Sequence, residues 1–236
     1  MKLQNEIVLA APSTPRASVE ANAIDCDLIA PWYEPAEHLC FGRALEARRN
    51  AFLADLGQVR TALTCGEGDG RFTAALLRSN PQVKVTAVDA SQRMAQVAER
   101  RLMKMGDGFR RRADYRCGEI HSFAPPQRAY ELIATHFFLD CFSTEEASNV
   151  VHRVAGWAAP QARWIVSEFA QPDAPVAHIW TGAVIRSLYA AFRVTTGLRV
   201  THLPDYHPAL RLAGFELRKQ EQALGGLLIS ELWQRK

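Results

Sequence analysis

The residues best suited to chemistry lie in the stretch LTCGEGDGRF, residues 63–72, in which glycines alternate with the acids Glu67 and Asp69. The three glycines are Gly66, Gly68 and Gly70. Glycine-rich loops that open a helix commonly bind phosphate through backbone N–H groups. Two carboxylates facing such a ligand would repel a phosphate, whereas they would favour a ligand that carries positive charge. The loop therefore indicates a ligand other than a phosphate.

Asp89 is the second informative residue. It ends the strand-like run VKVTAVD at 83–89, 19 residues after Gly70. An acid at this place in a nucleotide-binding fold can reach the two hydroxyls of a ribose. The dinucleotide fingerprint G-x-G-x-x-G is incomplete, because Arg71 stands where the third glycine would be. A nucleoside that lacks phosphate and carries a positive charge points to S-adenosylmethionine as the cofactor.

The run LTCGEGDGRF…VTAVDASQRMAQVAERRL resembles the first two motifs of the class I S-adenosylmethionine-dependent methyltransferases. GEI at 118–120, YELIATHFFLD at 130–140 and AGFEL at 213–217 are similar to later parts of that family. The resemblance covers roughly residues 25–236, and the joint spacing is more specific than any single motif. The stretch at 27–42 also resembles, less specifically, the first helix of the quinone-biosynthesis C-methyltransferase branch.

The resemblance implies a set of cofactor-binding residues. Asp89 would bind the ribose, Glu119 the adenine amine, and Met94 would pack against the adenine ring. The full set is Gly66, Glu67, Gly68, Gly70, Asp89, Ala90, Ser91, Met94, Glu119, Ile120 and Thr135. The family usually has an acid two residues before the first glycine, where this chain has Thr64. Glu67 or a water molecule would have to replace that contact.

The methyl acceptor is expected beside the fourth strand, because ligands of open α/β sheets bind outside the carboxyl ends of the strands. His136 lies near the end of that strand and could act as a general base or orient the acceptor. The alternative is a buried structural histidine. The expected acceptor-binding residues are Tyr33, Asp140, Arg186 and Tyr189. A small apolar or aromatic molecule is the expected acceptor.

The elements that must position these residues alternate between strand and helix. The expected strands are 59–65, 83–89, 113–119, 130–138, 162–169, 215–220 and 227–234. The expected helices are 71–79, 91–105, 144–158 and 176–193. Alternation predicts right-handed crossovers and a doubly wound, Rossmann-like α/β fold with a seven-stranded, mostly parallel sheet. The last two strands are joined too closely for a crossover, so they should form an antiparallel hairpin.

The domain plan follows from the same pattern. Residues 1–24 are rich in Ala, Pro and Ser and are expected to form a flexible tail. Residues 25–236 would form a single domain, in which 25–57 make an N-terminal helical cap that ends at Gly57. A chain of 236 residues fits one such domain.

Composition excludes several other classes of protein. The net charge of +3 is too small to indicate nucleic acid as a partner, and the FRRR run at 109–112 is expected to be a solvated loop. The five cysteines have no metal-binding spacing, so reduced thiols and no metal are expected. No stretch approaches the roughly 20 apolar residues of a membrane span. We therefore expect a cytoplasmic protein whose partner is a small-molecule methyl acceptor.

Two other functions remain open from the sequence. An NAD-dependent oxidoreductase would use the same fold, although Arg71 and the lack of a Tyr-x-x-x-Lys pair near the fourth strand count against it. A non-catalytic protein that keeps the cofactor fold is the other, and Thr64 gives it some support. The individual residues also have plainer alternatives, since Asp89 could cap a helix, Met94 could be core and Glu119 could be a solvated strand end.

Overall fold

The computed structural model describes residues 41–126, 129–171 and 202–236. Within them, seven strands form one sheet in the order β3-β2-β1-β4-β5-β7-β6. The strands are β1 (Thr61–Cys65), β2 (Lys84–Asp89), β3 (Ala113–Cys117), β4 (Tyr130–His136), β5 (Ala158–Phe169), β6 (Phe215–Ala223) and β7 (Leu228–Arg235). The first five strands pair in parallel, whereas β7 lies antiparallel to both β5 and β6. The expectation of a Rossmann-like α/β fold is confirmed.

The described helices lie between the strands. They are α2 (Ala44–Arg49), α3 (Arg71–Ser79), α4 (Gln92–Met105), α5 (Asp107–Arg110), α6 (Thr144–Ala155) and α8 (His207–Leu212). Short 3₁₀ turns occur at η1 (Leu53–Asp55), η2 (Leu139–Cys141) and η3 (Leu224–Gly226). Local chemistry explains two helix starts, because Ser91 caps α4 and Ser143 forms a capping box with Glu146 at α6.

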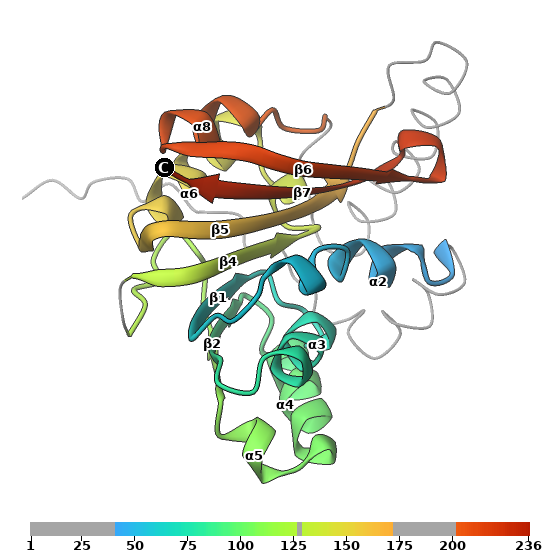
Figure 1. Cartoon of the computed structure of the whole chain (residues 1–236), viewed down its shortest axis with the longest axis vertical. Helices are drawn as coiled ribbons and strands as arrows, with labels where there is room; N and C mark the ends of the chain where they lie inside the picture. Colours follow the sequence, from blue (N-terminus) through green and yellow to red (C-terminus); the bar gives the residue numbers. More distant parts are fainter. Residues whose placement is uncertain (1–40, 127–128, 172–201) are drawn as a thin grey trace, which may run out of the picture.

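Hydrophobic side chains cover both faces of the sheet. One core joins α6 and α8 to the sheet through Val150, Leu210, Trp164 and Trp233. The other joins η1 and α3 to the opposite face through Phe52, Leu76 and Ile165. In Figure 1, α2 lies on the side to which the arrows of β4 and β5 point. The carboxyl ends of the parallel strands are therefore the edge on which the chemistry-bearing residues meet.

Several expected boundaries are wrong. The helical pattern before Gly57 is not one helix in the described residues, because α2 ends at Arg49 and η1 follows it. The apolar residues Phe52 and Leu56 are nevertheless buried. The spacing of apolar residues in this segment therefore indicated which side chains are buried, and not one continuous helix. The helix expected at 144–158 ends at Ala155, with Gly156 as its C-cap, and β5 begins earlier than expected. Part of the FRRR run belongs to α5.

Some expectations fall on parts of the chain outside the described residues. These are the tail at 1–24, the cap before residue 41 and the helix at 176–193, together with Tyr33, Arg186 and Tyr189. They stay predictions, as does the division into domains.

Candidate active site

The glycine loop lies between β1 and α3, and its glycines have left-handed backbone conformations. Gly66, Gly68 and Gly70 have φ values of +66°, +63° and +81°. A Cβ on Gly66 would lie 2.3 Å from the Phe138 ring, and one on Gly70 would lie 2.6 Å from Cβ of Ala98. Among the described residues, no atom lies within 4 Å of the same position on Gly68. The loop is thus packed at both ends and open at its middle glycine, where a ligand can approach the backbone.

Asp89 holds this loop to the end of β2. One carboxylate oxygen accepts the backbone N–H of Gly68 at 2.8 Å, and the other accepts that of Ser91 at 2.8 Å. Ser91 in turn accepts the N–H of Met94, which begins α4. The acid expected to bind a ribose therefore also joins the loop and the helix start into one unit. Each carboxylate oxygen has more than one lone pair, so these two bonds are compatible with a further bond from a ligand hydroxyl.

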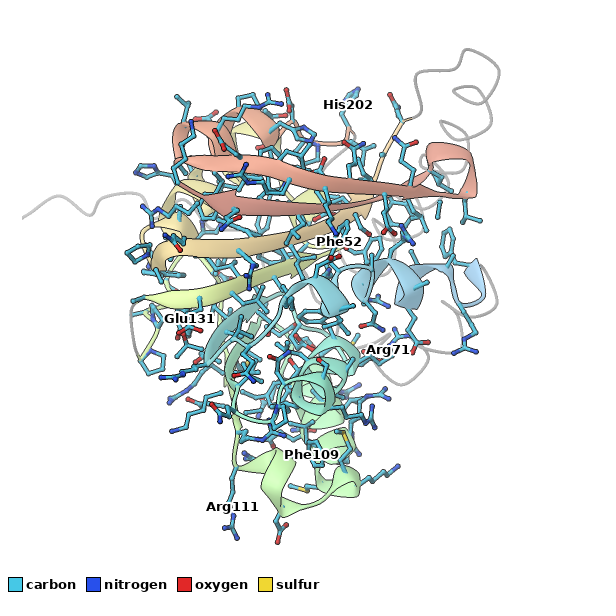
Figure 2. The ribbon with its side chains drawn as sticks, in the orientation of Figure 1. Phe52, Arg71, Phe109, Arg111, Glu131 and His202 are labelled. Carbon is cyan, nitrogen blue, oxygen red and sulfur yellow. The ribbon has the colours of Figure 1, made fainter. Side chains whose placement is uncertain are left out.

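The two loop acids have different partners. Asp69 is buried and forms ion pairs with Arg71 at 2.9 Å and with Arg101 of α4 at 3.1 Å. Figure 2 labels Arg71 at the start of α3. The idea that both acids favour a cationic ligand is therefore wrong for Asp69, because two arginines of the chain compensate its charge.

Glu67 turns back onto the helix that follows it. Its carboxylate accepts the backbone N–H of Thr73 in the first turn of α3 at 3.0 Å. Burial raises the pKa of Glu67 to about 7, although the hydroxyls of Thr64 and Thr73 act in the opposite direction. Glu67 thus lies beside Thr64, the position at which the resembled family has its acid.

The residues expected around adenine lie next to Asp89. The backbone N–H of Gly118 donates to the carbonyl of Asp89, the last residue of β2, at 2.9 Å. Glu119, the residue after Gly118, therefore lies beside the end of β2. Met94 and Ile120 are buried, whereas Glu119 is half-buried and Ala90 exposed. The structure brings these four residues to the same edge as the glycine loop.

Thr135 and His136 end β4 beside the loop but face opposite sides of the sheet. Thr135 pairs with Cys65 in the register of β1, and its hydroxyl accepts the indole N–H of Trp164 at 3.0 Å. Its side chain is therefore held in the core, and only its backbone adjoins the glycine loop. The His136 ring packs edge-on against Phe72 of α3, with ring centroids 4.4 Å apart.

His136 is a weak base in this position. Burial, helped by the positive charge of Arg49, lowers the pKa of His136 to about 3. The imidazole is therefore neutral at physiological pH, and it can both donate and accept a hydrogen bond. These properties favour orienting a polar group over removing a proton from it.

Asp140 is paired with a carboxyl group that sequence reasoning missed. Glu168, at the end of β5, accepts the backbone N–H groups of Phe138 and Leu139 at 3.2 and 2.8 Å. Burial raises the pKa of both carboxyl groups, and the neighbouring Asp140 raises that of Glu168 further. Two adjacent buried carboxyls retain a proton, because like charges cannot both ionise cheaply. The pair fixes the turn whose Phe138 ring covers Gly66.

Arg49 was also missed as a site residue. Its guanidinium lies over the Phe137 ring at 5.1 Å from the centroid, and the residue is 8% exposed. The sequence signal was weak, since Arg49 is one of several arginines in an amphipathic segment. Phe137 itself has a left-handed φ of 53°, which is uncommon for a residue other than glycine and occurs preferentially at functional sites.

Comparisons with known proteins agree with this geometry. Residues 62–161 match the sequence model of the methyltransferase domain family, a span from β1 into β5. No curated protein matches the chain at the sequence level. The structure resembles magnesium protoporphyrin IX methyltransferase from Synechocystis PCC 6803 with bound S-adenosylhomocysteine (TM-score 0.61, 18% identity, covering 82% of this chain and 83% of that one).

Two further solved structures are similar. The mitomycin 7-O-methyltransferase MmcR has a TM-score of 0.61 and 15% identity, over 90% of this chain and 61% of that one. An O-methyltransferase family protein from Burkholderia thailandensis has a TM-score of 0.65 and 18% identity, over 89% of this chain and 58% of that one. The chain therefore spans about three fifths of the length of these two proteins. At these identities the likeness shows the fold, and the sequence match to a methyltransferase domain covers residues 62–161.

Two further observations concern only the described residues. No group of three or more His, Cys, Asp or Glu side chains in them is arranged to hold a metal ion. No helix in the same ranges combines the length and the apolar character needed to cross a membrane.

Proposed function

We propose that the protein transfers a methyl group from S-adenosylmethionine to a small molecule, with an apolar or aromatic acceptor favoured. The observation that carries the proposal is the left-handed glycine loop, tied by Gly68 to the carboxylate of Asp89 at the ends of β1 and β2. This arrangement fits a nucleoside whose ribose meets Asp89 and whose remaining part lies along the open side of Gly68. The buried ion pair of Arg71 with Asp69 occupies the position at which a dinucleotide site has its third glycine.

The residues that would hold the cofactor have separate roles. Asp89 would accept the ribose hydroxyls, with Met94, Glu119 and Ile120 around the adenine. Glu67 would replace the acid that is missing at Thr64, since its carboxylate lies beside the Thr64 hydroxyl. The backbone of the loop and of Thr135 would line the rest.

When bound, S-adenosylmethionine supplies a methyl group on a sulfonium sulfur, whose carbon–sulfur bond breaks as the bond to the acceptor forms. The chain's own contribution is chiefly to hold the acceptor in line, and orientation alone can provide effective molarities on the order of 10⁵ M or more. Phe138 packs the turn after β4 against Gly66, so an acceptor held at that turn would lie next to a cofactor bound at the loop. His136 would orient a polar group of the acceptor rather than remove its proton.

Calorimetric titration tests the proposal. S-adenosylhomocysteine and S-adenosylmethionine should bind, and NAD should bind much more weakly. A methyl-transfer screen over small aromatic and apolar molecules then tests the reaction. Tight NAD binding without binding of either sulfur cofactor would support the oxidoreductase, whereas cofactor binding without turnover of any acceptor would support the non-catalytic alternative.

A further inference from the structure

Aromatic side chains gather at the carboxyl ends of β4 and β5. The rings of Phe41 and Phe169 lie 5.7 Å apart, and those of Phe137 and Phe169 lie 5.4 Å apart. All three are half-buried rather than buried in a core. Arg49, which is buried, lies over the ring of Phe137. The cluster therefore combines partly exposed aromatic surface with a buried cation packed against it.

His136 adds an unexplained feature to this cluster. The residue is 9% exposed, and neither ring nitrogen has a hydrogen-bond partner among the described residues. A buried polar group without a partner loses its hydrogen bonds to water and gains none in return, so such groups call for an explanation. A ligand that bonds to the imidazole would supply the missing partner.

The charge near His136 indicates the kind of ligand. The guanidinium of Arg49 lies over the ring of Phe137, the residue that follows His136, and its positive charge helps burial to lower the pKa of the imidazole. A cation that disfavours protonation at this position favours an anion there. A guanidinium matches planar anionic oxygen groups in shape and in hydrogen-bond geometry.

The position of the cluster relates it to the cofactor loop. His136 directly follows Thr135, which pairs with the last residue of β1, and Phe138 covers Gly66. The aromatic cluster thus begins at Phe137, one residue after the end of β4, and β4 pairs with the strand β1 that leads into the glycine loop. A molecule held there lies at the edge of the sheet at which the methyl group is expected.

We propose that Arg49, His136 and Phe137, with Phe41 and Phe169, bind the methyl acceptor, and that the acceptor is an aromatic molecule carrying an anionic oxygen, either a carboxylate or a phenolate. The rings hold the aromatic part, Arg49 pairs with the anionic oxygen, and His136 donates a hydrogen bond to a polar group. The role as acceptor site rests on the proposed function, whereas the binding of such molecules does not.

Ligand-observed NMR on the full chain tests this proposal, with S-adenosylhomocysteine binding measured separately by calorimetry. Four probes separate the contributions: benzoate, 4-nitrophenolate, neutral benzyl alcohol, and the non-aromatic anion cyclohexanecarboxylate. Benzoate, 4-nitrophenolate or both should bind about tenfold more tightly than the other two, a difference of about 1.4 kcal/mol. Binding of only one of the two identifies the anionic group.

Variants assign the binding to the cluster. Arg49→Met should weaken binding of the anionic aromatic probe about tenfold, which corresponds to about 1.4 kcal/mol. Arg48→Met is the matched control in the same helix, because that side chain pairs with Glu221 of β6, and it should change probe binding little. Should Arg49→Met fail to fold, the ring signals of histidine in the unaltered chain give the answer. The His136 signal, assigned by its loss in His136→Phe, should shift when the probe is added.

The outcomes distinguish the two proposals. Four results, each obtained with normal cofactor binding, would overturn the acceptor site while leaving methyl transfer in place. They are equal binding of all four probes, no probe binding at millimolar concentration, equal effects of Arg48→Met and Arg49→Met, and an unmoved His136 signal. Arg49-dependent probe binding without any cofactor binding would overturn methyl transfer and the acceptor role together, and leave a site for aromatic anions. Both kinds of binding, with the expected variant effects, support both proposals.

Discussion

The carboxylate of Asp89 accepts the backbone N–H of Gly68 at 2.8 Å, so the acid at the end of β2 is bonded directly to the glycine loop that follows β1. Its second oxygen accepts the N–H of Ser91. One side chain therefore fixes the loop, the start of α4 and the proposed ribose position together. Changes at Asp89 should consequently alter the loop as well as any contact with a ligand.

Asp89→Ala should weaken S-adenosylhomocysteine binding by about 1–3 kcal/mol, the range for removing a charged hydrogen-bond partner. The melting temperature should also fall, because two backbone N–H groups lose their acceptor. Calorimetry and thermal unfolding measure the two effects. Asp114→Ala is the control, since that acid is paired with Arg116 on the exposed part of β3 and should leave binding unchanged. Unchanged affinity in a folded Asp89→Ala protein would remove Asp89 from the cofactor site.

Gly66→Ala and Gly68→Ala form a matched pair. Both positions have left-handed backbone, so each alanine should cost about 1–2 kcal/mol of unfolding free energy. Within the part of the chain that the structure describes, the Cβ at 66 would meet Cδ2 of Phe138 at 2.3 Å and the Cβ at 68 would meet no atom, so the turn after β4 would have to move for Gly66→Ala alone. Denaturant unfolding should therefore show a larger loss for Gly66→Ala. Gly68→Ala should affect cofactor affinity more than stability, and equal effects of the two variants on both quantities would contradict this assignment.

Glu67 should make stability depend on pH. Its folded pKa of about 7 lies above the ordinary value of 4.5, so the unfolded chain ionises first. The resulting contribution to the free energy of unfolding is greatest below about 4.5 and is lost as the pH rises through about 7. Glu67→Gln should flatten the pH profile of unfolding over that window. Glu99→Gln, a partly exposed acid paired with Arg110, should leave the profile as it is.

His207 should likewise make the free energy of unfolding fall as the pH rises, over a range that begins near pH 6.5. Its ring bonds to the buried carboxylate of Glu231 at 2.8 Å, and this partner raises the pKa of His207 above its usual 6.5. A raised histidine pKa stabilises the fold below about 6.5, and the contribution is lost as the pH rises through the folded value. His207→Gln should therefore destabilise the protein more at pH 6 than at pH 9, as measured by urea unfolding. The exposed His152→Gln should show no such difference.

His136→Ala should reduce turnover more than it reduces cofactor affinity, because neither ring nitrogen bonds to a described residue and the proposal gives the imidazole to the acceptor. Since the pKa of His136 is about 3, its imidazole should not titrate near pH 6.5. Any inflection of the rate near pH 6.5 in the unaltered protein should therefore persist in His136→Ala. Steady-state kinetics over a range of pH, with calorimetry of cofactor binding, checks both points. Equal losses of affinity and turnover would assign His136 to the cofactor site, and no loss of either would leave it as a structural residue.

The sequence alone determined the features that depend on neighbouring residues. Glycine spacing predicted a loop between a strand and a helix, and the structure gives its three glycines a left-handed backbone that few other residues adopt. Strand and helix periodicity predicted the order of elements from β1 to β5, and the position of Asp89 followed from its place at the end of β2. Boundaries were less secure, as the shortened α2 and α6 show, because burial and helix continuity produce similar apolar patterns.

Only the tertiary structure decided which side chains meet across the chain. Asp69 appeared to be a ligand-facing acid until Arg101, 32 residues away, was found paired with it. Arg49 looked like an ordinary arginine of an amphipathic segment, although its guanidinium lies over the ring of Phe137. The pairing of Asp140 with Glu168 was equally hidden. Such contacts depend on the docking of distant elements and on burial, and no local pattern of residue types encodes either of them.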